Sequence, residues 1–313
     1  MRLPTSLLLA SLLAAAGPVA AQGGGPFSVD GRGYRTLEDA MGANMGRDIT
    51  VTIAPGVYRE CAVQTSDRVT YRAAQPGTVV FDGVTCEGKA ALVLRGKGST
   101  IDGIVFRNMR VGDGNGSGIR HEIGDLTVTN SMFLDSQEGI LGDTREYQPN
   151  GRVTIDRSTF SGLGQCDETP DCAHSVYLGA SGTITITNSR FERGRGGHYV
   201  KVRGPRVVIA DNSFDDSQGT RTNYAIDLPE GATGAITGNA FVQGKAKENW
   251  GAFIAVAAEA KKYRSGGLRI EGNEARLAPG QSKSPVFVAN GSGERLAIGA
   301  NTLGAGVRPY EDR

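Results

Sequence analysis

The sequence predicts an all-β protein built as a parallel β-solenoid, and three observations lead to this prediction. A six-residue motif that begins with Ile or Val and ends with Phe recurs along the chain. Successive copies lie 23 to 34 residues apart, and the units between them contain short alternating strands. Helical periodicity is almost absent. In a solenoid each coil buries the same face on its neighbours, so we expect Ile to stack on Ile and Phe on Phe.

The repeat is clear in the middle of the chain and weaker towards its end. Asn and Asp in the turn of the motif tolerate the left-handed conformation that a sharp corner needs. A propeller blade requires roughly 40 to 50 residues, and a leucine-rich repeat has its own Leu spacing, so neither fits. The clear copies are Ile101–Phe106, Val128–Phe133, Ile155–Phe160, Ile186–Phe191, Ile209–Phe214 and Ile236–Phe241, and the weaker ones are Ile270–Ala275 and Ile298–Leu303.

Residues 1–21 have the organisation of a cleavable signal peptide. Arg2 precedes the apolar run Leu7–Ala16, and the small residues Val19–Ala21 provide a cleavage site. The run is too short for a good membrane span and no second apolar segment follows, so we expect a secreted or periplasmic protein without membrane insertion. Removal of residues 1–21 leaves basic and acidic residues in equal number, which argues against a nucleic-acid partner.

Residues 22–49 are predicted to form an N-terminal segment with a short capping helix. Leu37, Ala40 and Met41 have helical spacing, and Thr36 is a candidate N-cap. Such a unit would cover the open end of a solenoid. Residues 50–313 are expected to form one β-helix domain.

Four cysteines allow three disulfide connectivities, and export makes disulfides favourable. Cys61 and Cys86 lie 25 positions apart, close to one repeat length, and Cys166 and Cys172 flank a short loop. We therefore predict the pairs Cys61–Cys86 and Cys166–Cys172, with free or metal-binding thiols as the alternative.

A second short strand precedes each motif, with an apolar residue on either side of a central one. Side chains alternate along a strand, so the central residue should point outward. Tyr177, Lys201 and Asp227 should then form one outward row on consecutive coils. The five strands are Val176–Leu178, Val200–Val202, Ile226–Leu228, Ile254–Val256 and Val286–Val288.

The histidines and a group of cations gather near the same row. His174 and His198 each lie three positions before a row residue, although an odd offset would point them inward in a continuous strand. His121 and Arg120 belong to a related region two coils earlier. Six cations occur between positions 190 and 206 against Glu192 alone, and they are Arg190, Arg193, Arg195, Lys201, Arg203 and Arg206. Arginine can bind a carboxylate or sulfate through two hydrogen bonds, which suits an acidic ligand.

The repeat and the run Ile53–Glu60 resemble the right-handed parallel β-helix of the pectin-lyase-like superfamily. Within it, the segments Ala173–Gly179, Gly197–Arg203 and Asn223–Pro229 resemble those of exported bacterial β-helix repeat proteins. The superfamily is rich in polysaccharide lyases, hydrolases and esterases. The resemblance therefore implies the fold and carbohydrate chemistry, but it identifies no reaction because this fold hosts many.

Residue types favour a polysaccharide lyase, which is a carbon–oxygen lyase that cleaves a uronate polymer by β-elimination. This β-elimination needs a group that neutralises the uronate carboxylate, a base and an acid. Arg203 fits the first role, Lys201 or His198 the second, and Tyr177 or His174 the third. The candidates for substrate binding are Asp227, Arg195, Arg206, Arg120 and His121.

Other readings stay open at this point. A glycosidase needs two carboxylates, and only Asp227 lies on the row. A uronate C5-epimerase uses the same proton abstraction, and a non-catalytic glycan-binding or structural solenoid needs no reaction. We expect no cofactor and a monomer. A zinc site at His174, His198 and Asp227 and a calcium site at residues 215–216 are weaker alternatives.

Overall fold

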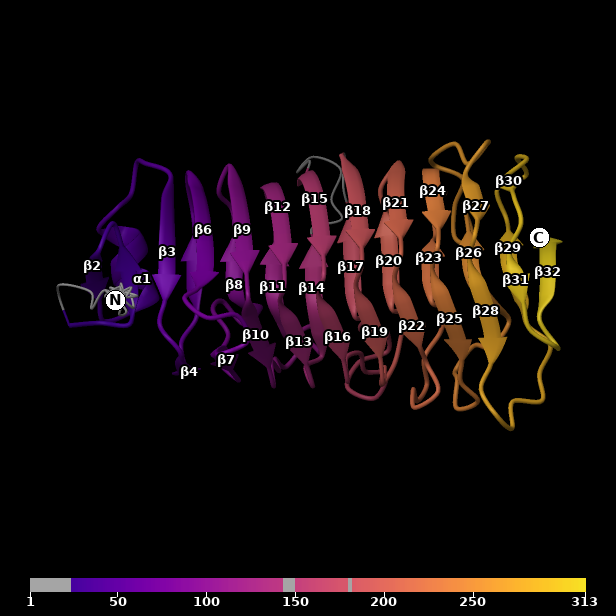
Figure 1. Cartoon of the computed structure of the whole chain (residues 1–313), viewed down its shortest axis with the longest axis horizontal. Helices are drawn as coiled ribbons and strands as arrows, with labels where there is room; N and C mark the ends of the chain where they lie inside the picture. Colours follow the sequence, from indigo (N-terminus) through magenta and orange to yellow (C-terminus); the bar gives the residue numbers. More distant parts are fainter. Residues whose placement is uncertain (1–23, 143–149, 180–181) are drawn as a thin grey trace, which may run out of the picture.

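The computed structural model describes residues 24–142, 150–179 and 182–313, and the chain forms the all-β parallel β-helix that the sequence predicts. The predicted signal peptide, residues 1–21, lies outside the described residues. The coils stack along one axis from the N-terminal to the C-terminal end (Figure 1). Each typical coil contributes one strand to each of three sheets, called A, B and C here.

Sheet A has twelve strands within the described residues. In spatial order they are β2 (Arg32–Tyr34), β1 (Phe27–Val29), β3 (Ile49–Ile53), β6 (Arg68–Ala73), β9 (Gly98–Asp102), β12 (Gly124–Thr129), β15 (Asn150–Asp156), β18 (Thr183–Thr187), β21 (Arg206–Ala210), β24 (Thr233–Thr237), β27 (Arg269–Glu271) and β30 (Ala297–Ile298). The strands from β3 to β30 run parallel, whereas β1 is antiparallel to both β2 and β3.

Sheets B and C each have ten parallel strands in the part of the chain that the structure describes. Sheet B contains β4 (Gly56–Tyr58), β7 (Val79–Asp82), β10 (Ile104–Arg107), β13 (Met132–Leu134), β16 (Thr159–Ser161), β19 (Arg190–Glu192), β22 (Ser213–Asp215), β25 (Ala240–Gln243), β28 (Glu274–Leu277) and β31 (Thr302–Leu303). Sheet C contains β5 (Ala62–Gln64), β8 (Ala90–Leu94), β11 (Ser117–His121), β14 (Glu138–Gly142), β17 (Val176–Gly179), β20 (Val200–Arg203), β23 (Ile226–Leu228), β26 (Ala252–Val256), β29 (Val286–Asn290) and β32 (Arg308–Asp312).

The Ile-to-Phe motif forms the corner between sheets A and B, and its residues stack as predicted. Ile155 pairs with Ile186 in sheet A, and Phe160 pairs with Phe191 in sheet B. Ring centroids of neighbouring Phe residues from Phe106 to Phe241 lie 4.8 to 5.2 Å apart. Full burial of one such side chain contributes about 1.5–3 kcal/mol, so this stack is a main source of stability.

The turn of the motif also behaves as predicted. Asn130, Asn188 and Asp211 have φ angles of 51°, 50° and 59°, in the left-handed region that Asn and Asp tolerate. Inside the same corner, buried Asn side chains form a ladder. The Asn239 Oδ1 atom accepts hydrogen bonds from the backbone N and the Nδ2 atom of Asn212, at 3.0 and 2.9 Å.

A six-residue helix, α1 (Leu37–Gly42), lies at the N-terminal end (Figure 1). The Thr36 hydroxyl accepts a hydrogen bond from the Asp39 N–H at 3.0 Å, and Leu37 and Ala40 are buried. The helix packs against β1, β2 and β5. Its role as a cap stays a prediction.

Both predicted disulfides are present. Cys61 and Cys86 precede the neighbouring strands β5 and β8, and their Cα atoms lie 5.4 Å apart. Cys166 and Cys172 close a short loop with a Cα–Cα distance of 4.3 Å.

The alignment of the last predicted strand of sheet C is wrong by two residues. Ala255 of β26 pairs with Ala289 of β29, so Ala289 rather than Phe287 is the outward residue. Phe287 is buried and packs against Phe241 and Phe253.

Candidate functional site

The predicted row on sheet C exists with the predicted register. Tyr177 pairs with Lys201, and Lys201 pairs with Asp227, on the consecutive strands β17, β20 and β23. Arg120 lies on the same row further toward the N-terminus, because it pairs with Leu141 and Leu141 pairs with Tyr177. Neighbouring strands of a sheet are about 4.8 Å apart, so the three central side chains lie on adjacent coils.

The two histidines lie beside this row rather than in the core. Tyr199 and Val200 both belong to the buried core, so two consecutive residues point inward and the strict alternation is broken between His198 and Lys201. The rings of His174 and His198 have centroids 4.9 Å apart, and the ring of His198 stacks on that of Tyr224 at 5.4 Å. His174, His198 and Tyr224 therefore form a second row parallel to the first.

The expectation that the row is exposed is wrong for two of its residues. The side chains of Lys201 and Asp227 are only 10% and 3% exposed. The segment after β26 folds back over them: the N–H groups of Glu259 and Ala260 each donate to the Pro229 carbonyl at 2.9 Å. Among Tyr177, Lys201 and Asp227, only Tyr177 is half-buried rather than buried.

Charged side chains surround Tyr177 in a connected network. The Lys201 Nζ atom donates to Glu259 Oε1 at 2.7 Å and lies 3.6 Å from Asp227 Oδ2. Arg203 Nη2 donates to the other oxygen of Glu259, and Arg203 Nη1 donates to Glu230 Oε1 at 2.9 Å. Lys201 and Arg203 thus hold one carboxylate between them. We call this pair of side chains the Lys201–Arg203 fork.

Tyr177 is joined to the fork through its hydroxyl group. The Tyr177 oxygen accepts a hydrogen bond from Arg203 Nε at 2.7 Å. The Lys201 Nζ atom lies 5.5 Å from the centre of the Tyr177 ring. A phenol hydroxyl that accepts from Arg203 still has its own O–H proton to donate, so Tyr177 can take part in proton transfer.

Burial perturbs the titrating groups behind the fork. Desolvation raises the pKa of Asp227 to about 7, although Lys201 opposes this shift. Desolvation also lowers the pKa of His174 to about 3 and that of His198 well below its usual value, and nearby Lys201 adds to both shifts. Burial favours the protonated form of Glu259, but the hydrogen bonds from Lys201 and Arg203 outweigh it and lower the pKa. Both imidazoles are therefore neutral near pH 7.

Several polar atoms at this site have no hydrogen-bond partner among the described residues although they are buried. They include His198 Nδ1, Asp227 Oδ1 and Glu230 Oε2 at the fork. Glu138 Oε2, one strand before His174, is another, and burial raises the pKa of Glu138 to about 8. Such atoms are rare in folded proteins, so each is a candidate contact for water or for a ligand.

The structure does not bring the other predicted binding residues to the fork. His121 is fully buried and faces the core, with Nε2 2.9 Å from the Gly124 carbonyl oxygen, and desolvation lowers its pKa to about 4. Arg206 is exposed on sheet A, and Arg195 pairs with Asp135. None of these three residues therefore lies at the fork, whereas Arg120 remains on the row, 3.9 Å from Glu122.

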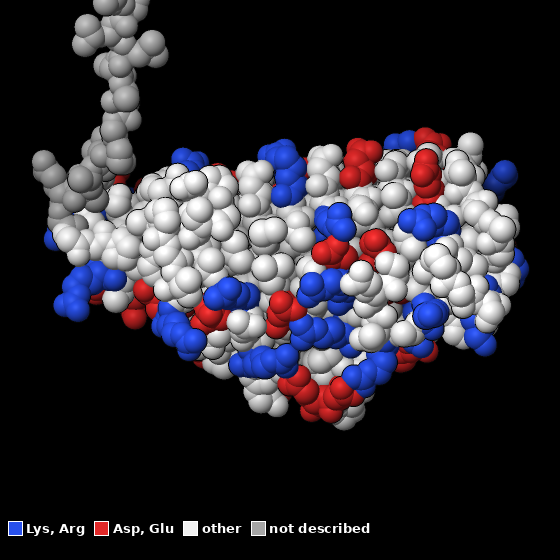
Figure 2. All heavy atoms as spheres, turned by 60° about the horizontal axis from the view of Figure 1, so that its bottom comes forward, with Lys and Arg blue, Asp and Glu red and all other residues white. Residues whose placement is uncertain are grey.

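The cation-rich segment does not form a positive patch. Arg190 pairs with Glu192 and Arg193 with Asp135, in addition to the pairs at the fork. On the face drawn in Figure 2, basic and acidic side chains are interleaved.

Glu259 is the main site residue that the sequence reasoning missed. It follows β26 in a segment that has no counterpart in the other coils, so the alignment of the repeats could not predict its position. Glu230 is a further residue outside the predicted set, and it contacts Arg203 directly.

No group of three His, Cys, Asp or Glu side chains in the described ranges could hold a metal ion. The proposed calcium residue Asp216 already accepts hydrogen bonds on both oxygens, from Tyr199 and Lys247 among others. None of the described helices is long and apolar enough to span a bilayer.

Comparison with solved structures finds other proteins at low sequence identity. A PL6 family alginate lyase, AlyGC, is 15% identical over 83% of this chain and 40% of its own, with a TM-score of 0.45. The ORF18 protein of Geobacillus virus E2 is 14% identical over 85% of this chain and 52% of its own, with a TM-score of 0.46. A second PL6 alginate lyase, in complex with a trisaccharide, is 12% identical over 84% of this chain and 82% of its own, with a TM-score of 0.37. This chain thus spans about half or less of the first two proteins.

A search with the sequence finds no match among curated proteins. A family model described as the right-handed beta helix region matches residues 122–294, which is more than half of the chain. The match covers the strands of sheet C from β14 to β29 and includes the fork. With its stacked parallel coils, the chain belongs to the right-handed β-helix family.

Proposed function

We propose that this protein is an exported polysaccharide lyase that cleaves an acidic, uronate-containing polysaccharide by β-elimination. One observation carries the proposal: the Lys201–Arg203 fork holds a carboxylate, that of Glu259. A uronate presents the same charged group to the same donors. The resemblance to carbohydrate-active β-helix proteins supports this choice of ligand.

Glu259 is the fork carboxylate that a substrate can displace. Its side chain is 45% exposed, whereas those of Glu230 and Asp227 are 16% and 3% exposed. It also lies on a segment outside the three sheets, so its movement leaves the strand ladders intact. We propose that Glu259 occupies the substrate carboxylate position in the free protein.

The proposed reaction breaks two bonds and forms one double bond. A base removes the proton from C5 of the uronate, the C4–O4 bond breaks, and a C4=C5 double bond forms while an acid protonates the O4 leaving group. Lys201 and Arg203 stabilise the negative charge that grows on the carboxylate. Tyr177 is the proton-transfer group of the site, because its hydroxyl touches Arg203 and its side chain is the half-buried member of the row.

The fork geometry changes the role we give to Lys201. A base needs an unprotonated amine, but the Lys201 ammonium donates to Glu259 and lies beside Asp227. We therefore assign Lys201 to carboxylate binding, with neutral His198 as the second candidate for the base.

The test is a screen of polygalacturonate, alginate and hyaluronan for the ultraviolet absorbance of the unsaturated product. Cleavage of one polymer, and none of its carboxyl-reduced form, supports the proposal. Arg203→Ala should abolish cleavage, and the matched control Arg206→Ala on sheet A should not. Absence of product from every acidic polymer would reject the lyase. Uptake of solvent deuterium at C5 without cleavage would indicate the epimerase instead.

A second candidate is a non-catalytic glycan-binding solenoid. One observation favours it: both fork cations are already paired with protein carboxylates. Binding of an acidic polymer that depends on Arg203, with no unsaturated product and no exchange at C5, would select this function.

A further inference from the structure

We propose that Trp250 and Lys283 form a second uronate-binding subsite on the C-terminal side of the Lys201–Arg203 fork. The inference rests on the proposed function only in its choice of ligand, an acidic polysaccharide. It adds a subsite that recognises a sugar ring and its carboxylate together.

Trp250 presents a partly exposed aromatic ring that carries a lysine ammonium over it. The residue is 40% exposed, and the Lys283 Nζ atom lies 5.0 Å from the centre of its ring. Lys283 is exposed, and its ammonium makes a cation–π contact with this ring. An indole offers a flat surface for the C–H face of a pyranose. A cation–π contact at an exposed site is worth only about 0.5–1 kcal/mol, so a sugar can displace the Lys283 ammonium from the ring and leave it to pair with the sugar carboxylate. A uronate carries both features, whereas a neutral sugar lacks the second.

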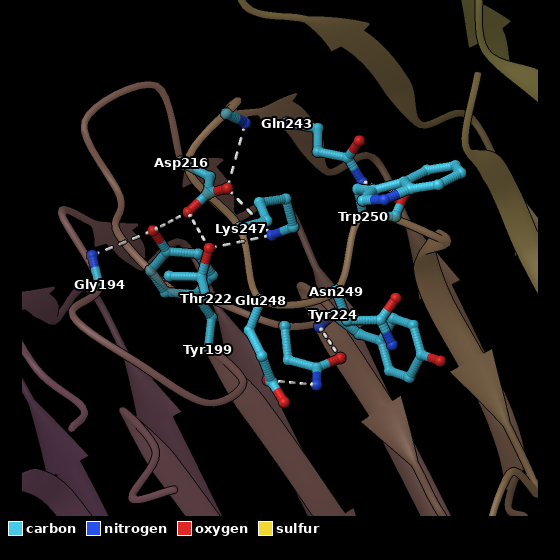
Figure 3. Close-up of polar contacts among 12 residues, drawn as sticks. Gly194, Tyr199, Asp216, Thr222, Tyr224, Gln243, Lys247, Glu248, Asn249 and Trp250 are labelled. Atoms are coloured by element: carbon cyan, nitrogen blue, oxygen red, sulfur yellow. Dashed lines mark hydrogen bonds and ion pairs between the residues drawn. The ribbon is translucent and has the colours of Figure 1, made fainter. Parts of the chain in front are cut away.

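An ion pair and hydrogen bonds of buried side chains fix the conformation of the loop that carries Trp250. The side chains of Lys247 and Asp216, 3% and 4% exposed, form an ion pair at 3.0 Å. Asp216 also accepts hydrogen bonds from Tyr199 and Thr222, at 2.8 and 2.7 Å (Figure 3). The Trp250 carbonyl accepts from Gln243 Nε2 at 3.3 Å. A fixed loop lets the aromatic ring bind without a large ordering cost.

The position of Trp250 continues the line of the site. Ile226 pairs with Ile254, so Tyr224 is level with Ala252, two residues after Trp250. Figure 3 shows the rings of Tyr224 and Trp250 projecting to the same side of this loop. Trp250 enters β26, two strands beyond β20, so it lies about 10 Å from Lys201 along the solenoid axis at roughly 4.8 Å per strand. A polysaccharide lying along sheet C would therefore meet the fork and then Trp250.

The single tryptophan of the chain makes the test direct. Tryptophan fluorescence of the full-length protein is titrated with oligosaccharides of polygalacturonate, alginate and hyaluronan, and with their carboxyl-reduced forms. We expect an acidic oligosaccharide to change the emission and its reduced form to bind at least about tenfold more weakly, the loss typical of a removed anchor contact. Lys283→Ala should weaken the acidic ligand similarly. The control Lys97→Ala, on a distant coil, should leave the affinity unchanged.

Trp250→Ala is tested by cleavage or by calorimetric binding, with circular dichroism to confirm the fold. A higher KM or Kd with unchanged kcat supports the subsite. Cleavage that persists with no fluorescence change and an unchanged KM in Trp250→Ala would overturn the subsite and leave the lyase intact. A Lys283-dependent fluorescence change without any cleavage would keep the subsite and reject the lyase. No response and no cleavage with any acidic polymer would overturn both.

Discussion

His198 and Lys201 project from the same face of the solenoid although three positions separate them in the chain. Tyr199 and Val200, which lie between them, are both buried in the core. This local break in alternation places a neutral imidazole and an ammonium group on neighbouring parallel rows, and Asp227 contacts both. The distances from Asp227 Oδ2 are 3.3 Å to His198 Nε2 and 3.6 Å to Lys201 Nζ. The arrangement holds a buried carboxylate directly behind the fork.

Replacement of Lys201 should destabilise the fold, because Lys201 is buried and pairs with Asp227. Removal of Lys201 leaves the buried Asp227 carboxylate without its cation, which costs up to about 3–5 kcal/mol above the Asp227 pKa of about 7, where this carboxyl is ionised. We expect Lys201→Ala to lose stability on this scale in urea unfolding. Exposed Arg206→Ala should stay within about 0.5 kcal/mol of the parent. Equal stabilities of the two variants would show that Lys201 is solvated in solution.

The Phe stack of sheet B should be sensitive to truncation. Phe160 is fully buried, and its ring lies 4.8 Å from those of both Phe133 and Phe191. Phe160→Ala should lower the free energy of unfolding by about 3–5 kcal/mol. Exposed Met132→Ala, on the neighbouring strand, is the control and should change it little. A small loss for Phe160→Ala would argue against stacked coils at this point.

The pH dependence of stability should become steeper when Asp227 is removed. The pKa of His174 is about 3 in the folded chain against about 6.5 unfolded, so the unfolded chain binds more protons between these values and stability rises with pH. Asp227 acts in the opposite direction. Its pKa is about 7 folded against about 3.9 unfolded, so its contribution to stability falls as pH rises through this window.

Asp227→Asn removes the opposing contribution and leaves both histidines in place. Between pH 4 and pH 6.5 its Tm should therefore rise more steeply than that of the parent, in thermal unfolding at a series of pH values. An unchanged profile would mean that Asp227 has its ordinary pKa in the folded protein, and a flatter one would mean that folding lowers this pKa; either result would contradict the account.

Replacement of Glu259 should strengthen substrate binding if this carboxylate occupies the substrate position. Glu259→Gln removes the charge that competes for Lys201 and Arg203. We expect KM to fall by up to about fivefold, the factor that an exposed ion pair of about 1 kcal/mol represents, with kcat unchanged. A loss of kcat would instead assign Glu259 to positioning of the fork.

The architecture could be predicted from the sequence because each coil repeats the same contacts. A fixed six-residue motif places Ile and Phe at constant strand positions, and a two-residue alternation fixes which side chains face outward. That regularity gave the register of Tyr177, Lys201 and Asp227. The alternation predicted the wrong outward residue at Phe287. Two consecutive side chains, Phe287 and Val288, face the core before Ala289, just as Tyr199 and Val200 do before Lys201.

The electrostatics of the site could not be predicted in the same way. Glu259 belongs to a segment that occurs in one coil only, and its position depends on bonds to the turn after β23. Burial of Lys201 follows from that segment and not from its own strand. The charge count from Arg190 to Arg206 favoured one binding site for an acidic ligand, but Arg195 pairs with Asp135 of an earlier coil and Arg206 lies on sheet A.

The central claim is that the Lys201–Arg203 fork binds the carboxylate of the reacting uronate. The most direct measurement is the turnover of the cleaved polysaccharide by Arg203→Ala, with Arg206→Ala as control and circular dichroism to confirm that both variants fold. We predict that Arg203→Ala loses a factor of about 100 or more in turnover, because the charge on the carboxylate grows in the transition state. Arg206→Ala should retain the parental rate. A folded Arg203→Ala variant with parental turnover would contradict the account.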